Sequence, residues 1–134
     1  MDTLNGGGGD DTLEGGAATD LAEFTSGAAV AVDLSAGTAE GEGSDILSGI
    51  ENITTAGGND TIIGDASDST FLAYGGDDSL SGGGGRDHMF GGTGNDTVLA
   101  GDLAHDRGAA ALAQLGGGHR GLRAIVTAGC TRGR

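Results

Sequence analysis

The sequence predicts an all-β protein made of short repeats, each with one glycine-rich loop and one brief strand. Three observations lead to this fold class. Glycine takes 31 of the 134 residues, against about 7% in average proteins. Acidic residues number 20 against 6 basic ones, which gives a net charge of −14. A nine-residue pattern recurs in which glycines, an aspartate and a large apolar residue keep their places. Glycine at fixed positions of a repeat serves backbone geometry, which a disordered acidic chain does not need.

The composition excludes several other classes. Collagen requires glycine at every third position and abundant proline, and this chain has no proline. A transmembrane helix needs about 20 consecutive apolar residues, and the sequence has no such run. Nucleic-acid binders are usually basic, whereas this chain is acidic. The single cysteine, Cys130, excludes an internal disulfide and a cysteine-based zinc site. The first residues lack the order of a secretory signal peptide.

The repeat follows the template G-G-x-G-x-D-x-U-x, in which U is a large apolar residue. Five nonapeptides run in frame over residues 55–99, and the frame extended back from the first copy begins in mid-repeat, at Asp2. The other copies are residues 6–14, 15–23 and 40–48. The U position is large and apolar in eight of nine copies, where chance at this composition gives about three, so these residues are predicted to form the core. They are Leu4, Leu13, Ala22, Leu47, Ile62, Phe71, Leu80, Met89 and Val98.

Each part of the repeat has a physical role. Glycine adopts positive φ without a steric clash, so a GGxGx run can form a tight loop that turns its carbonyl oxygens toward one point. The aspartate at position six adds a carboxylate, and the next three residues form a strand whose central residue points inward. Such oxygens suit Ca²⁺, which accepts about six to eight of them in flexible geometry, better than Mg²⁺. Zinc prefers Cys and His ligands, and His88, His105 and His119 lack metal-ligand spacing.

On these residues the chain resembles the RTX, or hemolysin-type, calcium-binding nonapeptide repeat. The copies GGGGRDHMF at 82–90 and GGTGNDTVL at 91–99 carry the resemblance most fully. It implies a parallel β-roll, a right-handed β-solenoid with two nonapeptides per coil, followed here by an irregular C-terminal tail. It also implies several bound Ca²⁺ ions and a secreted, extracellular bacterial protein. The basic ending GCTRGR differs from the acidic or apolar endings common in such exported proteins. Together with the start in mid-repeat, it suggests a fragment of a longer protein, or a gene whose end has shifted frame.

The implied coil gives a pairing rule, because loops on one side of the roll are eighteen residues apart. Asp60, Asp78 and Asp96 obey this rule and are predicted to form one ladder with ions between successive loops. Asp2 and Asp20 obey it as well. The candidate calcium ligands are Asp60, Asp78, Asp96, Asp87, Asp11, Asp20, Asp2 and Asp45.

The opposite side of the roll is predicted to hold a weaker ladder. Its series is Ser69, Asp87 and His105, of which only Asp87 is a carboxylate, although Asp65 or Asp68 can partly substitute for the serine. Toward the N-terminus, the same spacing sets Asp11 against Ala29, which leaves Asp11 without a carboxylate partner. An insertion from about residue 24 breaks the frame there. The expected segments are N-terminal repeats at 1–23, a β insertion at 24–54 that contains the repeat at 40–48, the main array at 55–102 and a tail at 103–134.

The insertion is predicted to be a longer coil or cap packed on the roll, with a ligand-binding surface as the alternative. Its alternating Val30, Val32 and Leu34 indicate a half-buried strand. Gly37 can make the following turn, and a second apolar strand is expected around Ile50 and Ile53. The acids Asp33, Glu40, Glu42 and Glu51 are expected to face solvent. Either Glu40 or Glu42 can alternatively reach a nearby ion.

The tail differs from the repeats in charge. Residues 1–102 carry a net charge of −18 and residues 103–134 a net charge of +4. The segment AAALAQL at 109–115 can form a short helix, and IVTA at 125–128 a strand. The rest of this Gly/Ala/Arg-rich tail is predicted to be poorly ordered. A basic tail can bind nucleic acid or an anionic membrane, but a weakly docked terminus is the simpler interpretation.

The predicted function is a non-enzymatic calcium-binding module whose folding is coupled to calcium. Nineteen carboxylates against one arginine in residues 1–102 oppose compaction until a cation neutralises them. The expected partners are calcium ions, without nucleic acid and without a membrane span, and an open sheet edge allows self-association. One alternative is an accessory fragment of a larger RTX enzyme of the protease, lipase or epimerase type, although neither H-E-x-x-H nor G-x-S-x-G occurs. Another is an adhesive structural solenoid.

Overall fold

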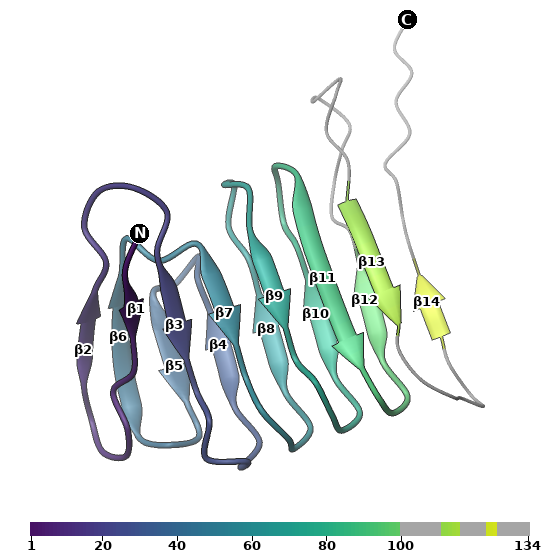
Figure 1. Cartoon of the computed structure of the whole chain (residues 1–134), viewed down its shortest axis with the longest axis horizontal. Coiled ribbons are helices and arrows are strands. Elements are labelled where there is room, and N and C mark those ends of the chain that lie inside the picture. The colour runs from purple at the N-terminus through teal and green to yellow at the C-terminus, as the bar shows by residue number, and fades with distance from the viewer. Residues whose placement is uncertain (100–110, 116–122, 126–134) are drawn as a thin grey trace, which may run out of the picture.

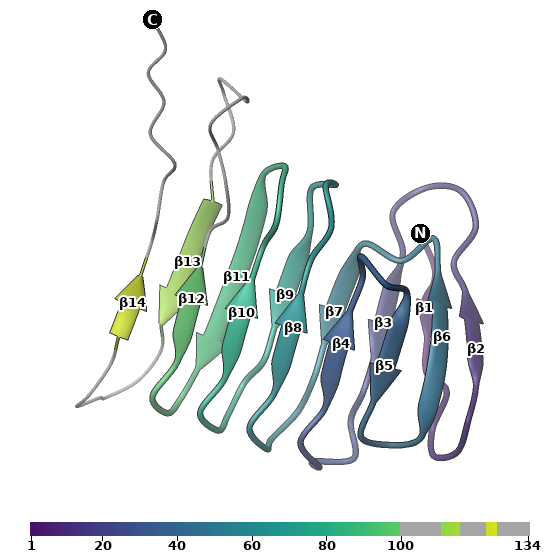
Figure 2. The same cartoon turned by 180° about the vertical axis from the view of Figure 1, so that it is seen from behind.

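A computed structural model describes residues 1–99, 111–115 and 123–125 of the chain. Within these ranges the regular structure consists of strands, which form two sheets that face each other (Figures 1 and 2). The chain passes from one sheet to the other and back as it advances from β1 to β14 (Figure 1). In the part of the chain described, no helix has the length and apolar character that a membrane crossing requires. The predicted parallel β-roll is confirmed.

One sheet has six strands and the other has eight. The six-stranded sheet runs in the order β1 (Thr3–Leu4), β3 (Leu21–Glu23), β7 (Asn52–Thr54), β9 (Thr70–Leu72), β11 (Asp87–Gly92) and β13 (Ala111–Leu115). The eight-stranded sheet runs in the order β14 (Arg123–Ile125), β12 (Thr97–Leu99), β10 (Ser79–Ser81), β8 (Thr61–Ile63), β4 (Ala31–Asp33), β5 (Thr38–Glu40), β6 (Ser44–Ser48) and β2 (Thr12–Glu14).

The register confirms the eighteen-residue coil in the main array. In the eight-stranded sheet Ile62 pairs with Leu80 and Leu80 with Val98, all in parallel strands. In the six-stranded sheet Phe71 pairs with Met89. All five side chains are buried at 1% exposure or less, because the central residue of each three-residue strand points between the sheets. The core is therefore a double row of U-position side chains.

The insertion forms a meander of three strands in the eight-stranded sheet. β4 pairs with β8 in parallel, β5 pairs antiparallel with both β4 and β6, and β6 pairs with β2 in parallel. Val30 and Val32 are buried as expected, and Leu34 is partly buried. Gly37 makes the turn at a φ of 75° and donates its N–H to the Asp33 carbonyl at 2.8 Å. The meander therefore adds strands to one sheet that have no counterpart in the other.

Part of the basic segment adds one strand to each sheet. β13 pairs with β11 and β14 with β12, both in parallel. The helix expected over 109–115 is therefore wrong for residues 111–115. That helix is too short to be stable alone, whereas the edge of β11 offers a row of hydrogen-bonding groups. The strand β14 (Arg123–Ile125) overlaps the expected IVTA strand at 125–128 only at Ile125. The remainder of the tail, with His105, lies outside the described residues.

Candidate metal centre

Glycine at the fourth repeat position lets successive loops stack in contact. Gly58, Gly76 and Gly94 have φ values of 106°, 119° and 129°, in the region that only glycine adopts readily. A Cβ on Gly76 would lie 1.7 Å from the Gly58 carbonyl oxygen, and one on Gly94 would lie 1.8 Å from that of Gly76. The loops therefore approach each other through backbone alone, with the carbonyl oxygen of one loop against the glycine of the next.

The aspartates at the sixth position form the predicted ladder on this side of the roll. The Asp60 N–H donates to Asp78 Oδ1 at 2.8 Å, and the Asp78 N–H donates to Asp96 Oδ1 at 3.0 Å. The Val30 N–H continues the series by donating to Asp60 Oδ1 at 2.9 Å. Each carboxylate is thus fixed by the backbone of the preceding coil. Because Val30 occupies the aspartate position of the meander, the ladder of carboxylates stops there.

The ladder on the opposite side contains a residue that the pairing rule missed. The Ser69 N–H donates to Asp87 Oδ1 at 3.1 Å, as the rule predicts. Asp2 and Asp20 also pair as predicted, with the Asp2 N–H donating to Asp20 Oδ1 at 2.5 Å. The Asp20 N–H then donates to Glu51 Oε2 at 3.0 Å. Glu51 therefore takes the sixth position of its coil, and the expectation that it faces solvent is wrong.

Asp11 has a carboxylate partner after all. Its N–H donates to Asp45 Oδ1 at 2.9 Å, and the strands that follow pair Thr12 with Ile46. The predicted facing of Asp11 and Ala29 is wrong, because the meander runs back along the sheet and returns β6, rather than β4, to β2. The pairing distance across the insertion is consequently 34 residues.

The second carboxylate oxygen of six ladder aspartates is buried and has no hydrogen-bond partner. Among the described residues, six side-chain oxygens are buried without a hydrogen bond, and all are aspartate Oδ2 atoms. They belong to Asp11, Asp20, Asp60, Asp78, Asp87 and Asp96. Where a repeat begins with glycine, that residue makes room for this atom, since a Cβ on Gly82 would lie 2.2 Å from Asp87 Oδ2 and one on Gly91 2.6 Å from Asp96 Oδ2. Buried carboxylate oxygens without partners are costly, so the fold fits a cation at these atoms.

Burial raises the pKa of two of these carboxyls. The pKa of Asp78 rises to about 7, chiefly through desolvation and further through the charges of Asp60, Asp96 and Asp77, against the hydrogen bond from the Asp60 N–H. The pKa of Asp87 rises to about 6, again chiefly through desolvation. Both groups have an electrostatic cost that a divalent cation would remove.

Side chains alone do not build this site. In the part of the chain described, no group of three or more His, Cys, Asp or Glu side chains converges as a metal cluster. In the main array Asp60, Asp78 and Asp96 instead lie in a row along the roll, one per coil. An ion at these carboxylates would need further oxygen ligands, such as main-chain carbonyls, and such a ligand set suits Ca²⁺ better than Zn²⁺.

A second row of polar side chains, at the fifth repeat position, links the same loops. The Asp77 N–H donates to Asn59 Oδ1, and the Asn95 N–H donates to Asp77 Oδ1, each at 2.9 Å. The Arg86 N–H donates to Asp68 Oδ1 at 2.8 Å. These bonds run in the opposite direction to those of the sixth-position ladder. The sequence reasoning did not find this row, although the eighteen-residue recurrence of Asn59, Asp77 and Asn95 is a signal for it.

Comparison with known protein families agrees with this geometry. The family model of the RTX calcium-binding nonapeptide repeat matches the chain in four copies, at residues 1–27, 45–71, 54–89 and 64–98. Together these matches cover more than half of the chain. No curated protein matches the chain.

Proposed function

Because the chain belongs to the family of RTX calcium-binding nonapeptide repeats, and is thus a calcium-binding repeat module, we propose that its aspartate ladders hold the ions and that ion binding drives folding. The observation that supports this proposal most directly is the set of six buried Oδ2 atoms without partners. We infer that main-chain carbonyls of the glycine-rich loops complete the set of hard oxygen donors around these atoms.

The main array offers the most regular sites. Asp60, Asp78 and Asp96 supply one carboxylate per coil on one side, and Asp87 supplies one on the other. Calcium supplies positive charge to a row of negative groups in partly desolvated surroundings. In the row of Asp60, Val30 interrupts the carboxylates, so that Asp45 and Asp11 form a separate group. We therefore propose two sets of ions along this row, one before and one after the meander.

Coupled folding follows from the balance of charge and core. Residues 1–102 carry a net charge of −18, and the core rows are one side chain wide in each sheet. Without a cation, repulsion between the carboxylates opposes the fold, and a core of this size offsets little chain entropy. With calcium, the free energy of ion binding becomes free energy of folding.

We further propose that the chain acts outside the cell as a non-enzymatic module. Extracellular calcium reaches the concentrations at which modules of this kind bind, about 10⁻⁴ to 10⁻³ M, and proteins of this family are typically secreted. The alternatives remain an accessory part of a larger RTX enzyme and an adhesive solenoid. An adhesive solenoid whose binding is independent of ions would keep its adhesion when Asp78 is replaced.

The test is a calcium titration of two charge-matched variants, followed by circular dichroism and calorimetry. Asp78→Asn removes a buried ladder carboxylate, whereas Glu40→Gln removes an exposed one on β5. We expect Asp78→Asn to raise the calcium concentration at the folding midpoint by about tenfold or more and Glu40→Gln to leave it nearly unchanged. Equal midpoints for the two variants, or a wild-type spectrum that does not respond to millimolar calcium, would contradict the proposal.

A further inference from the structure

The meander opens a wedge between two loops that would otherwise be stacked. β1 and β3 are neighbours in the six-stranded sheet, whereas β6 and β5 separate β2 from β4 in the eight-stranded sheet. Neighbouring strands lie about 4.8 Å apart. The loops at 5–11 and 24–30 therefore lie about 4.8 Å apart where they leave β1 and β3, and about 14 Å apart where they enter β2 and β4. In the main array the corresponding loops remain one spacing apart throughout.

The turn between β5 and β6 fills only the base of this wedge. The Gly9 N–H donates to the Glu42 carbonyl at 2.8 Å, and the backbone of Gly43 contacts that of Gly9 so closely that a Cβ would overlap it. On the other flank, a Cβ on Gly41 would lie 2.4 Å from the Ala29 carbonyl oxygen. What remains above the turn is a cavity of about 420 Å³ that is bounded by all three loops and is wide open to solvent.

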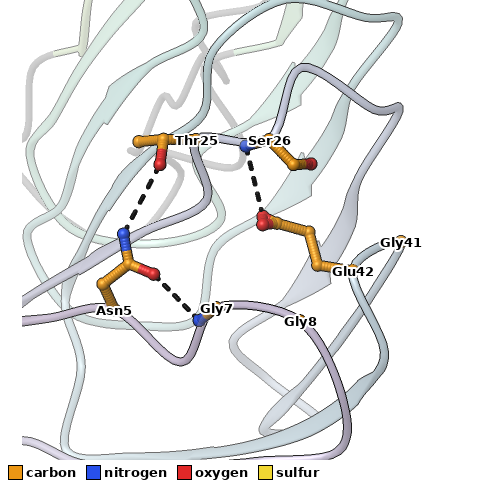
Figure 3. A pocket seen from close by; sticks show the side chains of 7 residues that line it. All are labelled: Asn5, Gly7, Gly8, Thr25, Ser26, Gly41 and Glu42. Atoms are coloured by element: carbon orange, nitrogen blue, oxygen red, sulfur yellow. Dashed lines mark hydrogen bonds between the residues drawn. The ribbon is translucent and has the colours of Figure 1, made fainter.

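Polar side chains from the three loops face this cavity (Figure 3). The Gly7 N–H donates to Asn5 Oδ1 at 2.9 Å, and Asn5 Nδ2 donates to Thr25 Oγ1 at 3.5 Å. The Ser26 N–H donates to Glu42 Oε2 at 3.4 Å (Figure 3). The last two contacts are long, so the carboxylate of Glu42 and the amide of Asn5 retain capacity for further hydrogen bonds.

Size and charge restrict the ligand that the cavity can accept. Its volume lies within the range of small-molecule sites, about 300 to 1,000 Å³, and is much larger than a bare ion needs. None of the seven residues that line the cavity is basic, and the carboxylate of Glu42 disfavours an anionic ligand. None of these residues carries an aromatic side chain on which an aromatic ligand could stack.

We propose that this cavity binds a neutral sugar of one or two rings. Sugar hydroxyls can donate to Glu42 and to Asn5 Oδ1, and can accept from the hydroxyls of Thr25 and Ser26. With about 30 Å³ per water-sized group, the volume accommodates one ring, with about a dozen non-hydrogen atoms, or part of a second. The glycines of the lining keep the backbone open to such a ligand, because they add no side chain in front of it.

The experiment uses the full chain in saturating calcium and saturation-transfer NMR with glucose, galactose, N-acetylglucosamine, maltose and cellobiose. We expect signal from at least one of these sugars. Glu42→Ala should weaken that binding by about tenfold or more, whereas the matched Glu40→Ala should change it less than about twofold. Glu42→Gln, which keeps an acceptor, should restore part of the affinity.

Circular dichroism of each variant in calcium separates loss of binding from loss of fold, and the wild-type calcium response tests the calcium proposal independently. The cavity proposal is overturned if none of the sugars gives signal to the calcium-bound chain. It is equally overturned if Glu42→Ala binds as the wild type does, if Glu40→Ala loses as much, or if inorganic phosphate or putrescine binds in place of the sugars.

Discussion

Acid should partly replace calcium in folding this chain. The pKa of Asp78 is about 7 and that of Asp87 about 6 in the folded roll, both raised chiefly by burial, against a usual value of 3.8. A carboxyl whose pKa is raised by folding binds its proton more tightly in the folded state. Its contribution to stability is therefore complete below the unfolded pKa of 3.8 and is lost as the pH rises through the folded pKa.

The magnitude follows from the two shifts. Each pH unit between the unfolded and folded pKa values changes the free energy of unfolding by about 1.36 kcal/mol per group. Between pH 8 and pH 5 the gain is about 3 kcal/mol from Asp78 and about 1 kcal/mol from Asp87. The total of about 4 kcal/mol corresponds to a change of about a thousandfold in the ratio of folded to unfolded chains.

The assay is far-ultraviolet circular dichroism of the calcium-free chain from pH 8 to pH 5, with sedimentation velocity to verify that it stays monomeric. We expect β content to rise on acidification. The double variant Asp78→Asn, Asp87→Asn should show little of this dependence, because its side chains are neutral throughout. Asp33→Asn is the control, since the hydrogen bond from Ser35 lowers the pKa of Asp33 and leaves it ionised over this range. A wild-type signal that is flat or falls toward pH 5, or a double variant with the same slope, would refute the reasoning.

Two further predictions concern the loops and the core. Gly76→Ala should abolish the calcium-induced transition, because residue 76 has a φ of 119° and its new Cβ would overlap the Gly58 carbonyl oxygen. Gly57→Ala is the control and should titrate like the wild type, because its Cβ would meet nothing within 4 Å. Similar calcium titration curves for the two variants would contradict the stacking of the loops. Leu80→Ala should lower the free energy of unfolding in calcium by about 3 kcal/mol, since Leu80 is 1% exposed and lies between Ile62 and Val98. Urea titration measures this loss, with Ile63→Ala as the control because Ile63 is 39% exposed. If Leu80→Ala loses no more stability than Ile63→Ala, the core is not made of the U positions.

The sequence predicts the main array well because its information is local and periodic. One side chain per nonapeptide defines the core, and one aspartate per nonapeptide defines a ladder, so the coil length alone sets Asp60 beside Asp78 and Asp78 beside Asp96. Glycine at the fourth position is required for the same steric reason at Gly58, Gly76 and Gly94. A uniform repeat therefore places every residue once the frame and the coil length are known.

The same rule fails across the insertion, where pairing depends on the order of strands in space. The meander runs back along its sheet, so Asp11 faces Asp45 rather than Ala29, and the short connection from β6 to β7 brings Glu51 to the position of a ladder aspartate. A longer side chain can serve there because the hydrogen bond to the Asp20 N–H needs only a carboxylate oxygen within reach. The loops that the meander forces apart leave the cavity beside Glu42. The departure from periodicity thus separates Asp11 and Asp45 from the row of Asp60 and also creates this cavity, so both features follow from a single change in strand order.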